Sequence, residues 1–518
     1  MDKDIFSEKL PYAADLAAQE ERFMEHYGVP SVLLMERAAL SVYAEIPEKT
    51  KRILFLCGRG KNGADGLAAA RILREQGRSA DIFLLPSGRE TPEFLYQKKL
   101  LSEFPEGRIY RDFEGVQEVI GFYDCIVDAV FGIGFNRKMD SGLLELFQTA
   151  NETNALRISV DIPSGVLSDT GAVFDTAFKA DITVTFSYGK PGLFLYPGRS
   201  FAGAVKLRKI GIPDRIAPEN VPFVTGTPGA LPVFPKRPDD AHKGTFGRIA
   251  VFAGSAGMPG AAVLSTKACY RAGGGVVKLF SESSVLKVVN EIMPEVITEE
   301  IRPETLSEEM LKGFRAFAVG PGLGKSEEAM KIVKLLLKVP IPSVWDADAI
   351  NILSEMLPGR EPEEETAHFL KRRLAALAGL MGTEAVMTPH PKELSGLLGI
   401  GLSELRENAK EFLPLFKELP FVLVMKDAAT VVAGKGRAYL NQTGNSGMAT
   451  GGSGDVLTGI LGAFLSIFEP FTAAERAVYL HGLCGDRAKE RLSGTSMTAG
   501  DLIASLCILS GEEEKSET

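Results

Sequence analysis

The run NSGMATGGSGD at residues 445–455 combines clustered glycines with one carboxylate, directly before an apolar helical stretch. Unpaired backbone N–H groups and the helix dipole make a glycine-rich helix start a binding site for anions. An aspartate in that place can take a proton from a hydroxyl group that attacks a bound phosphate. The run therefore predicts a phosphoryl-transfer site with Asp455 as its base, and a tight turn with an acidic first-turn residue is the structural alternative.

Three further segments of the C-terminal half of the chain follow strand-like runs and carry polar side chains. Asp346 and Asp348 end one run, TPHPKE with His390 and Glu393 follows another, and KDAAT at 426–430 joins two more. Hydrated Mg²⁺ takes one or two carboxylates together with phosphate oxygens, so these acids are candidate magnesium ligands. His390 is a candidate substrate contact, although a lone histidine is more often structural, and the 426–430 segment is a candidate frame for a nucleotide.

Near the N-terminus, GRGKNGADG at 58–66 follows a strand-like run and formally matches the GxGxxG pattern. A dinucleotide-binding dehydrogenase also needs an acidic residue at the end of its second strand, where it holds a ribose. Here that strand ends in LLPS at 84–87, and Asp81 lies at its other end. The sequence therefore argues against an oxidoreductase.

Two later strand-like runs of the same half end in Asp128 and in Asp161-Ile162-Pro163-Ser164. Because the carboxyl ends of parallel strands share one crevice, these residues are expected to meet Asn62 and Asp65 there. Two carboxylates, an amide and a hydroxyl suit a hard cation beside an acid/base group. The alternative is that Asp128 and Asp161 only cap the turns that follow them.

The elements that must position these residues alternate between strand and helix, which predicts α/β units with parallel sheets covered by helices on both faces. In the first half, strands are expected at 52–57, 81–85, 123–128, 156–161 and 182–186, and helices at 13–27, 32–46, 65–76, 95–101, 143–149 and around Ala177. In the second half, strands are expected at 248–253, 276–280, 316–319, 343–346, 385–388, 421–425 and 430–433, and helices at 261–272, 454–468, 472–492 and 498–509.

Seven prolines between residues 213 and 238 mark the domain boundary, because proline lacks a backbone donor and fits neither a helix nor a central strand. We expect one domain at 1–217, an extended linker at 218–238, a second domain at 239–511 and an acidic tail at 512–518. The acidic stretch 361–366 predicts an exposed insertion or a flexible helix start.

Composition narrows the class of protein. With 58 Lys+Arg against 67 Asp+Glu, the 518-residue chain has a net charge of −9, which argues against nucleic-acid binding. It has no apolar run long enough to span a membrane, and MDKDIFSEKL is not an export signal. The cysteines at 57, 125, 269, 484 and 507 form no CxxC pair, so we expect small core residues and a cytoplasmic location.

The motifs GRGKNGADG, VDAVFGIG, DIPSG and EHYGVPSVLLMERAA resemble the epimerase domain of the NAD(P)H-hydrate repair family, over about residues 10–215. The resemblance implies a Rossmann-like three-layer fold and a K⁺ ion held by Asn62, Asp128 and Ser164. Our hypothesis is that Asp161 is the acid/base group of the epimerisation. The substrate contacts that it implies are Lys61, Asn62, Gly63, Ala64, Asp65, Gly132, Ile133, Gly134, Phe135, Asn136, Arg137, Lys138 and Asp161. Lys61 and Ala64 depart from the family's NNGGD loop, which leaves the local geometry open.

The second half resembles the ribokinase-like superfamily, and within it the ADP- or ATP-dependent NAD(P)H-hydrate dehydratases, over about residues 225–511. The matching motifs are HKGTFG, GMPGAAVLSTKACYRAGGG, GPGLG, DADAIN, TPHPKE and NSGMATGGSGDVLTGI. The implied hydrate contacts are Ala261, Gly322, Gly324, His390 and Asp455. The implied nucleotide contacts are Lys426, Asp427, Ala428, Ala429, Thr430, Gly451, Gly452, Ser453 and Gly454, with Mg²⁺ at Asp346 and Glu393.

The two resemblances together imply a bifunctional enzyme that epimerises hydrated NADH and NADPH and dehydrates the S hydrate with a nucleotide. They imply K⁺, Mg²⁺ and ADP or ATP, small-molecule substrates, and a homo-oligomer without nucleic-acid or membrane partners. One alternative is a ribokinase-like kinase of a small alcohol, such as a vitamin precursor, fused to a ligand-binding domain that has lost activity. The choice of ADP or ATP and of NADH or NADPH hydrate is open at this point.

Overall fold

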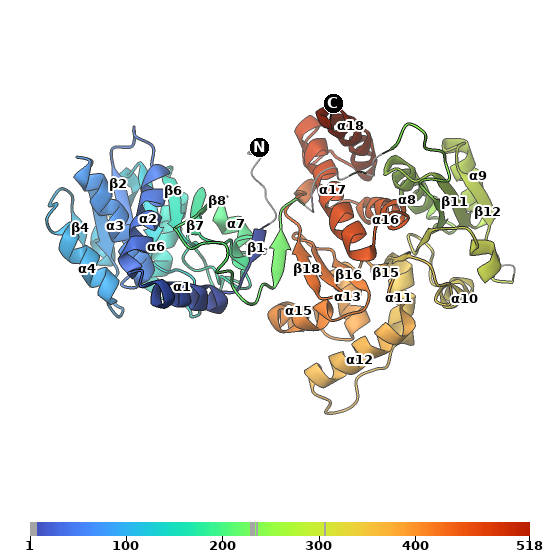
Figure 1. The fold of residues 1–518 in the computed structure, drawn as a ribbon, viewed down its shortest axis with the longest axis horizontal. Coiled ribbons are helices and arrows are strands. Elements are labelled where there is room, and N and C mark those ends of the chain that lie inside the picture. The colour runs from blue at the N-terminus through green and yellow to red at the C-terminus, as the bar shows by residue number, and fades with distance from the viewer. Residues whose placement is uncertain (1–7, 228–233, 235–236, 305–306, 518) are drawn as a thin grey trace. The chain divides into compact units, whose positions relative to one another are not determined.

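The computed structural model describes residues 8–227, 234, 237–304 and 307–517 and divides the chain into two compact units, Glu8–Val224 and Thr225–Thr518 (Figure 1). Within the described residues, no helix is both long and apolar enough to cross a membrane. Each unit has a largely parallel sheet with helices packed on it, so the predicted α/β fold class is confirmed.

The N-terminal unit contains a parallel sheet in the order β4-β3-β2-β5-β6-β7-β8. Its central strands are apolar throughout because both faces are covered: Ile53 and Phe55 face the core formed with α2 and α3, while Leu54 and Leu56 face the core formed with α6. The strands are β1 (Glu8–Leu10), β2 (Ile53–Cys57), β3 (Ala80–Leu84), β4 (Ile109–Tyr110), β5 (Cys125–Ala129), β6 (Leu156–Val160), β7 (Ile182–Phe186) and β8 (Ala204–Arg208). The helices are α1 (Ala13–Tyr27), α2 (Ser31–Ala44), α3 (Lys61–Glu75), α4 (Pro92–Leu101), α5 (Phe113–Gln117), α6 (Ser141–Glu152) and α7 (Arg199–Ala202).

The C-terminal unit has seven parallel strands in the order β12-β11-β10-β13-β14-β15-β16, followed by β17 and β18, which pair antiparallel. One face packs against α8, α16, α17 and α18, and the other carries stacked rings such as Phe252 and Phe280, 4.8 Å apart. The strands are β10 (Arg248–Phe252), β11 (Val276–Ser281), β12 (Ile297–Glu300), β13 (Ala316–Val319), β14 (Ser343–Trp345), β15 (Ala385–Met387), β16 (Val422–Met425), β17 (Val431–Gly434) and β18 (Arg437–Leu440). The helices are α8 (Pro259–Arg271), α9 (Ser283–Ile292), α10 (Glu327–Leu336), α11 (Ala347–Met356), α12 (Thr366–Leu380), α13 (Pro391–Leu398), α14 (Leu402–Glu407), α15 (Ala409–Lys417), α16 (Ser453–Leu465), α17 (Pro470–Arg491) and α18 (Ala499–Glu517).

Several expected elements differ from the structure. The prediction of a helix around Ala177 was wrong. The segment is irregular, and Ala177 packs beside Ile162 and Val166 under the turn that follows β6. The stretch 218–238 contains a short strand, β9 (Phe223–Thr225), whose three residues include no proline and keep their backbone donors. Residues 228–233 and 235–236 of that stretch lie outside the described residues.

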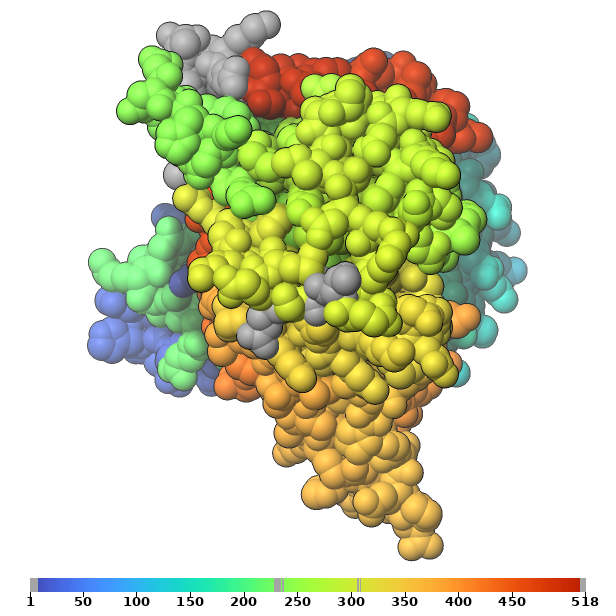
Figure 2. Space-filling view, turned by 90° about the vertical axis from the view of Figure 1, so that its right-hand side faces the viewer, coloured from blue at the N-terminus to red at the C-terminus, as the bar shows by residue number. Residues whose placement is uncertain are grey.

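Two smaller predictions can also be compared with the structure. Four cysteines are buried, as expected of small core residues, whereas Cys507 is exposed on α18, so that prediction was wrong for it. The exposure expected of the acidic stretch is confirmed for 361–363, and α12 begins at Thr366; this helix projects from its unit (Figure 2). Whether the stretch is an insertion or a flexible helix start stays a prediction. Glu364 anchors the loop through an ion pair with Arg372 at 2.7 Å.

Candidate functional sites

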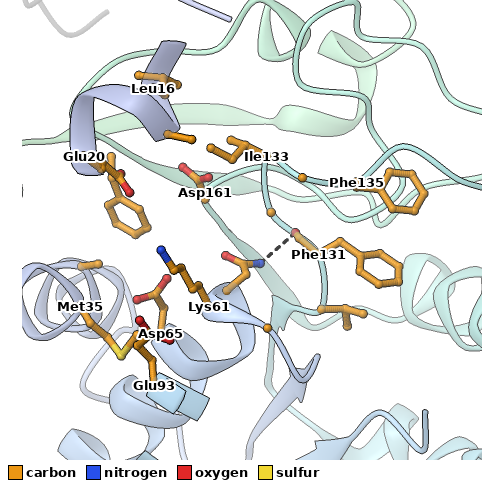
Figure 3. Close-up of a pocket in the computed structure, with 18 of the residues that line it drawn as sticks. Leu16, Glu20, Met35, Lys61, Asp65, Glu93, Phe131, Ile133, Phe135 and Asp161 are labelled. Atoms are coloured by element: carbon orange, nitrogen blue, oxygen red, sulfur yellow. Dashed lines mark hydrogen bonds between the residues drawn. The ribbon is translucent and has the colours of Figure 1, made fainter. Parts of the chain in front are cut away.

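A cavity of about 750 Å³ opens at the carboxyl ends of the strands in the N-terminal unit (Figure 3). It lies where ligands bind in open α/β sheets, between the turns that follow β2, β3, β5, β6 and β7 and the helices α1 and α2. Ten of the residues predicted for the substrate line it: Lys61, Asn62, Asp65, Gly132, Ile133, Gly134, Phe135, Asn136, Arg137 and Asp161.

Three predicted contacts, Gly63, Ala64 and Lys138, are not among the residues that line this cavity. A Cβ on Gly63 would lie 1.9 Å from the carbonyl oxygen of Gly58, so this glycine allows two backbone segments to approach. Ala64 is fully buried in the apolar core because α3 begins at Lys61, four residues earlier than expected. Its methyl group therefore packs inside the protein and leaves the ligand side of the loop unchanged.

Asp161 projects into the cavity from a strained turn. Its φ of 69° lies in the left-handed region, and the Ile162 N–H donates to the Val160 carbonyl at 2.9 Å, which closes a three-residue γ-turn. Such a conformation is costly for a residue other than glycine and is found mainly at functional sites. The carboxylate is held by Lys190, whose Nζ donates to Oδ1 at 2.5 Å.

Lys190 and Glu20, which line the same cavity, were not predicted from the sequence. Lys190 follows β7. Because the carboxyl ends of parallel strands share one crevice, the reasoning used for the other strands would also have predicted Lys190 as a cavity residue. Glu20 comes from α1, far away in the sequence, and no local spacing points to it. Figure 3 shows the Glu20 and Asp65 carboxylates on the same side of the cavity as Lys61.

The cavity is rich in acids, and burial dominates their electrostatics. Burial raises the pKa of Glu20, and the negative charge of Asp161 raises it further, while Lys190 and Lys61 lower it. Burial also raises the pKa of Asp65 well above its ordinary value, with Asp161 and Glu20 adding to the shift. A protonated and an ionised carboxyl group can thus face one ligand, which is the arrangement that acid/base chemistry needs.

Beside the cavity, Asn62 and Ser164 contact the peptide of Phe131, and Asp128 contacts Ser164. Ser164 Oγ donates to Asp128 Oδ1 at 2.6 Å and accepts from the Phe131 N–H at 2.8 Å, while Asn62 Nδ2 donates to the Phe131 carbonyl at 2.8 Å. The Asp128 carboxylate is fully buried, and burial raises its pKa to about 6 although neutral groups donate hydrogen bonds to it. Both Asp128 oxygens accept hydrogen bonds, so a cation bound here would replace some of these donors.

In the C-terminal unit, Asp346 joins three segments at the carboxyl end of the sheet. It follows β14, and its Oδ1 accepts from Lys426 Nζ at 2.7 Å while its Oδ2 accepts from Thr458 Oγ1 of α16 at 2.6 Å. A Cβ on Gly454 would lie 3.4 Å from Lys426 Nζ, so this ammonium group sits beside the glycine run. The remaining predicted nucleotide residues 427–430 form the turn between β16 and β17.

The glycine run opens helix α16 as expected. Gly452 is the N-cap residue with φ 87°, and among the described residues no side chain caps the helix, so its start can receive an anion. His481 of α17 lies against this start, with Nε2 3.0 Å from the Ser453 carbonyl oxygen, and burial lowers its pKa to about 4. This neutral histidine was missed, because its sequence position within a long helix carries no signal.

Asp455 lies in the first turn of α16. Burial and the neighbouring carboxylates of Asp346 and Asp348 raise its pKa to about 6, against the opposing charge of Lys426. Of the predicted hydrate contacts, Gly324 donates its N–H to Asp348 Oδ2 at 2.9 Å, and a Cβ on Gly322 would lie 2.9 Å from that of Ala261. A carboxylate with this pKa is suited to accept a proton near neutral pH.

The two predicted magnesium ligands, Asp346 and Glu393, lie near each other and near Lys426, and both are hydrogen-bonded within the protein. Both oxygens of Asp346 accept hydrogen bonds, and Glu393 Oε2 accepts from the His390 N–H at 2.8 Å in a capping box at the start of α13. Among the described residues, no group of three or more His, Cys, Asp or Glu side chains could hold a metal ion. His390 itself is half exposed and caps α13.

Gly452, which has a positive φ at the start of α16, allows the backbone geometry of the glycine run to be tested. We expect Gly452→Ala to lower the free energy of unfolding by about 1–2 kcal/mol, because a side chain is strained at this φ. Its Cβ would also lie 2.4 Å from Leu264 Cδ1. Gly451→Ala, with nothing within 4 Å of its Cβ, is the matched control in urea unfolding. Equal stabilities of the two variants would contradict the assigned conformation.

Family models match both units. Residues 249–507 match the model described as NAD(P)H-hydrate dehydratase, and residues 31–192 match the model of the YjeF-related protein N-terminus. A bifunctional NAD(P)H-hydrate repair enzyme from Moorella thermoacetica is 34% identical, over 98% of this chain and 97% of its own length. This chain belongs to the bifunctional NAD(P)H-hydrate repair family. The family predicted from the sequence motifs is confirmed.

Other members of the repair family match over a similar extent. The bifunctional NAD(P)H-hydrate repair enzyme from Thermofilum pendens is 33% identical, over 96% of this chain and 95% of its own length. Among solved structures, the ADP/ATP-dependent NAD(P)H-hydrate dehydratase from Bacillus subtilis, co-crystallised with ATP/Mg²⁺, is 30% identical. That comparison covers 54% of this chain and 94% of the Bacillus chain, with a TM-score of 0.46.

Proposed function

We propose that the N-terminal unit interconverts the R and S hydrates of NADH and NADPH, and that the C-terminal unit dehydrates the S hydrate with a nucleotide as phosphoryl donor. The arrangement that best supports this function is Asp455 at an uncapped glycine-rich helix start, beside Lys426 and Asp346. Hydration of the nicotinamide ring leaves a hydroxyl group on the carbon next to the ring nitrogen. That hydroxyl group is the acceptor that a phosphoryl-transfer site requires.

In the dehydration, Asp455 takes the proton of the substrate hydroxyl group. The oxygen of that hydroxyl group bonds at the same time to the terminal phosphorus of the nucleotide. The bond from that phosphorus to the bridging oxygen breaks, and backbone N–H groups of residues 451–454 stabilise the transferring charge. The ring nitrogen then expels phosphate, and loss of a proton from the neighbouring carbon restores the double bond. Mg²⁺ is expected to enter with the nucleotide, and Asp346 and Glu393 are its proposed protein ligands.

In the epimerisation, the ring nitrogen expels the protonated hydroxyl group as water, and water returns to either face of the same carbon. Asp161 is the proposed acid/base group, because it projects from its turn into the cavity that the predicted substrate residues line. Asp65, on the other side of Lys61 in Figure 3, adds a second carboxyl group to the same cavity.

We assign the epimerase to residues 1–217 and the dehydratase to residues 239–511, with the linker 218–238 between them. Helix α18 ends at Glu517 and so continues into the acidic tail at 512–518. The homo-oligomer and the cytoplasmic location expected from the sequence stay predictions.

A bound K⁺ ion would be held by Asn62, Asp128 and Ser164, where it would neutralise the buried carboxylate and fix the turns that border the cavity. We expect epimerisation to slow at least tenfold when KCl is replaced by tetramethylammonium chloride of the same ionic strength. Asp128→Asn should be slow in both salts. Dehydration of purified S hydrate in the same buffers is the control, and equal epimerisation rates in the two salts would contradict the site.

The proposed function is tested by following absorbance at 340 nm after the protein is added to mixed epimers of hydrated NADPH with magnesium and ADP or ATP. Nucleotide-dependent recovery of all the NADPH, faster than spontaneous epimerisation allows, is the expected result. Fast recovery of only part of it, followed by a slow phase, would support the dehydratase alone. No recovery with either nucleotide would overturn the proposal and favour the small-alcohol kinase.

A further inference from the structure

Lys190 is a buried ammonium group whose three donors are all used. Its side chain is only 3% exposed, and Nζ donates to Asp161 Oδ1 at 2.5 Å, Thr185 Oγ1 at 2.8 Å and the Phe186 carbonyl at 3.1 Å. Removing a lysine from water is costly, and replacing buried ion pairs by apolar residues is often stabilising. Stability alone therefore gives no reason for a lysine at this position.

The local backbone explains how Lys190 reaches Asp161. Strand β7 ends in the same kind of turn as β6: Ser187 has a φ of 60°, and the Tyr188 N–H donates to the Phe186 carbonyl at 2.6 Å. Two neighbouring strands thus end in strained γ-turns, one presenting Asp161 and the other turning the chain back so that Lys190 meets it. Both residues line the cavity.

The charges around Asp161 show why this carboxylate needs a partner. Glu20 from α1 and Asp65 from α3 are acidic neighbours whose own pKa values the charge of Asp161 raises, and Lys61 from α3 is a positive neighbour on an exposed side chain. Among the described residues, Lys190 is the cation in direct contact with Asp161. It binds Oδ1, which also accepts from Thr185 at 3.4 Å, so Oδ2 is the oxygen left to meet a ligand.

We propose that Lys190 is a positioning residue of the epimerase, which fixes Asp161 as an oriented carboxylate with one oxygen directed at the substrate. This inference rests on the proposed function, because it assumes that Asp161 exchanges the proton. Displacing a catalytic group such as this proton acceptor by about 1 Å can lower the reaction rate about 100-fold. Lys190 acts through Asp161, and its own protons stay in its three hydrogen bonds.

The first experiment measures epimerisation by Lys190→Ala in the full-length chain. We expect kcat to fall about 100-fold with little change in KM, while dehydration of purified S hydrate stays at the wild-type rate. Primary alkylammonium ions, tested from methyl- to butylammonium, should restore part of the lost rate, and tetramethylammonium, which has no N–H donor, should not. Lys209→Ala, at an exposed lysine paired with Asp214, is the matched control and should epimerise normally.

The second experiment is a double-mutant cycle with Asp161→Asn. If Lys190 acts through Asp161, the double variant should epimerise no more slowly than Asp161→Asn alone. A further loss, or wild-type epimerisation by Lys190→Ala, would overturn the inference while leaving the proposed function standing. If Lys190→Ala also loses dehydration, the variant is misfolded, and Lys190→Arg is compared with Lys190→Met instead. The charged arginine variant should keep much more epimerisation than the neutral methionine variant, and equal rates would overturn the inference. Absence of epimerisation in the wild-type chain would instead overturn the proposed function.

Discussion

Asp455→Asn is expected to lower the rate of dehydration by about 10²–10⁴-fold, the usual contribution of a general base. Asparagine keeps the shape of the side chain and cannot take the proton of the substrate hydroxyl group. Nucleotide binding should persist, because the helix start and Lys426 are unchanged. Glu490→Gln, at an exposed carboxylate of α17 paired with Arg487, is the control. More than a tenth of the wild-type rate in Asp455→Asn would show that another group is the base.

The same variant should be more stable than the wild type at neutral pH. Folding raises the pKa of Asp455 from 3.8 to about 6, so the folded state binds this proton more tightly than the unfolded chain. The resulting penalty is absent below about pH 4, grows between the two values, and is complete above about pH 6. We expect Asp455→Asn to gain about 1–2 kcal/mol at pH 7.5, after allowance for partial solvent exposure, and to gain nothing at pH 4.

Asp161→Asn is expected to slow epimerisation by about 10²–10⁴-fold and to leave dehydration of purified S hydrate unchanged. The amide oxygen can still accept from Lys190, so the turn is retained while the acid/base function is lost. Mixed epimers would then be repaired in two phases, with the slow phase at the spontaneous rate. The measurement is the amplitude and rate of each phase at 340 nm.

The control for Asp161→Asn is Asp169→Asn, a carboxylate of the same unit that accepts from the Ala13 N–H at 2.8 Å and does not line the cavity. It should show the wild-type single phase. Unchanged epimerisation in Asp161→Asn would assign the acid/base role to a different carboxyl group, with Asp65 the first to test.

Strand ends and glycine runs were predictable from the sequence because their signals are local. Asp128, Asp161 and Asp346 follow apolar runs, and parallel strands bring such positions to one edge of a sheet. The helix start at Asp455 was found for the same reason, since glycines and an acid directly precede an apolar stretch. The sheet order itself could not be read, and the edge strand β4 is too short to give a periodic signal.

What the sequence could not give were partners contributed by distant elements. Glu20 and His481 lie in ordinary amphipathic helices, and only packing brings them to the cavity and to the glycine run. The sequence also did not show that the Ala64 methyl group is buried in the core, because the helix begins one turn earlier than expected; its substrate contact stays a prediction. The hydrogen bonds that occupy Asp346 also depend on tertiary contacts, with Lys426 and Thr458.

The two strained turns after β6 and β7 also have an evolutionary consequence. Holding Asp161 and Ser187 at positive φ costs about 1–3 kcal/mol at each residue, which glycine at the same position would largely avoid. Natural selection for stability alone would therefore replace both residues by glycine. In a homologue whose epimerase has fallen out of use, selection for stability should favour glycine at the position of Asp161, so this single position would mark inactive domains in sequence data.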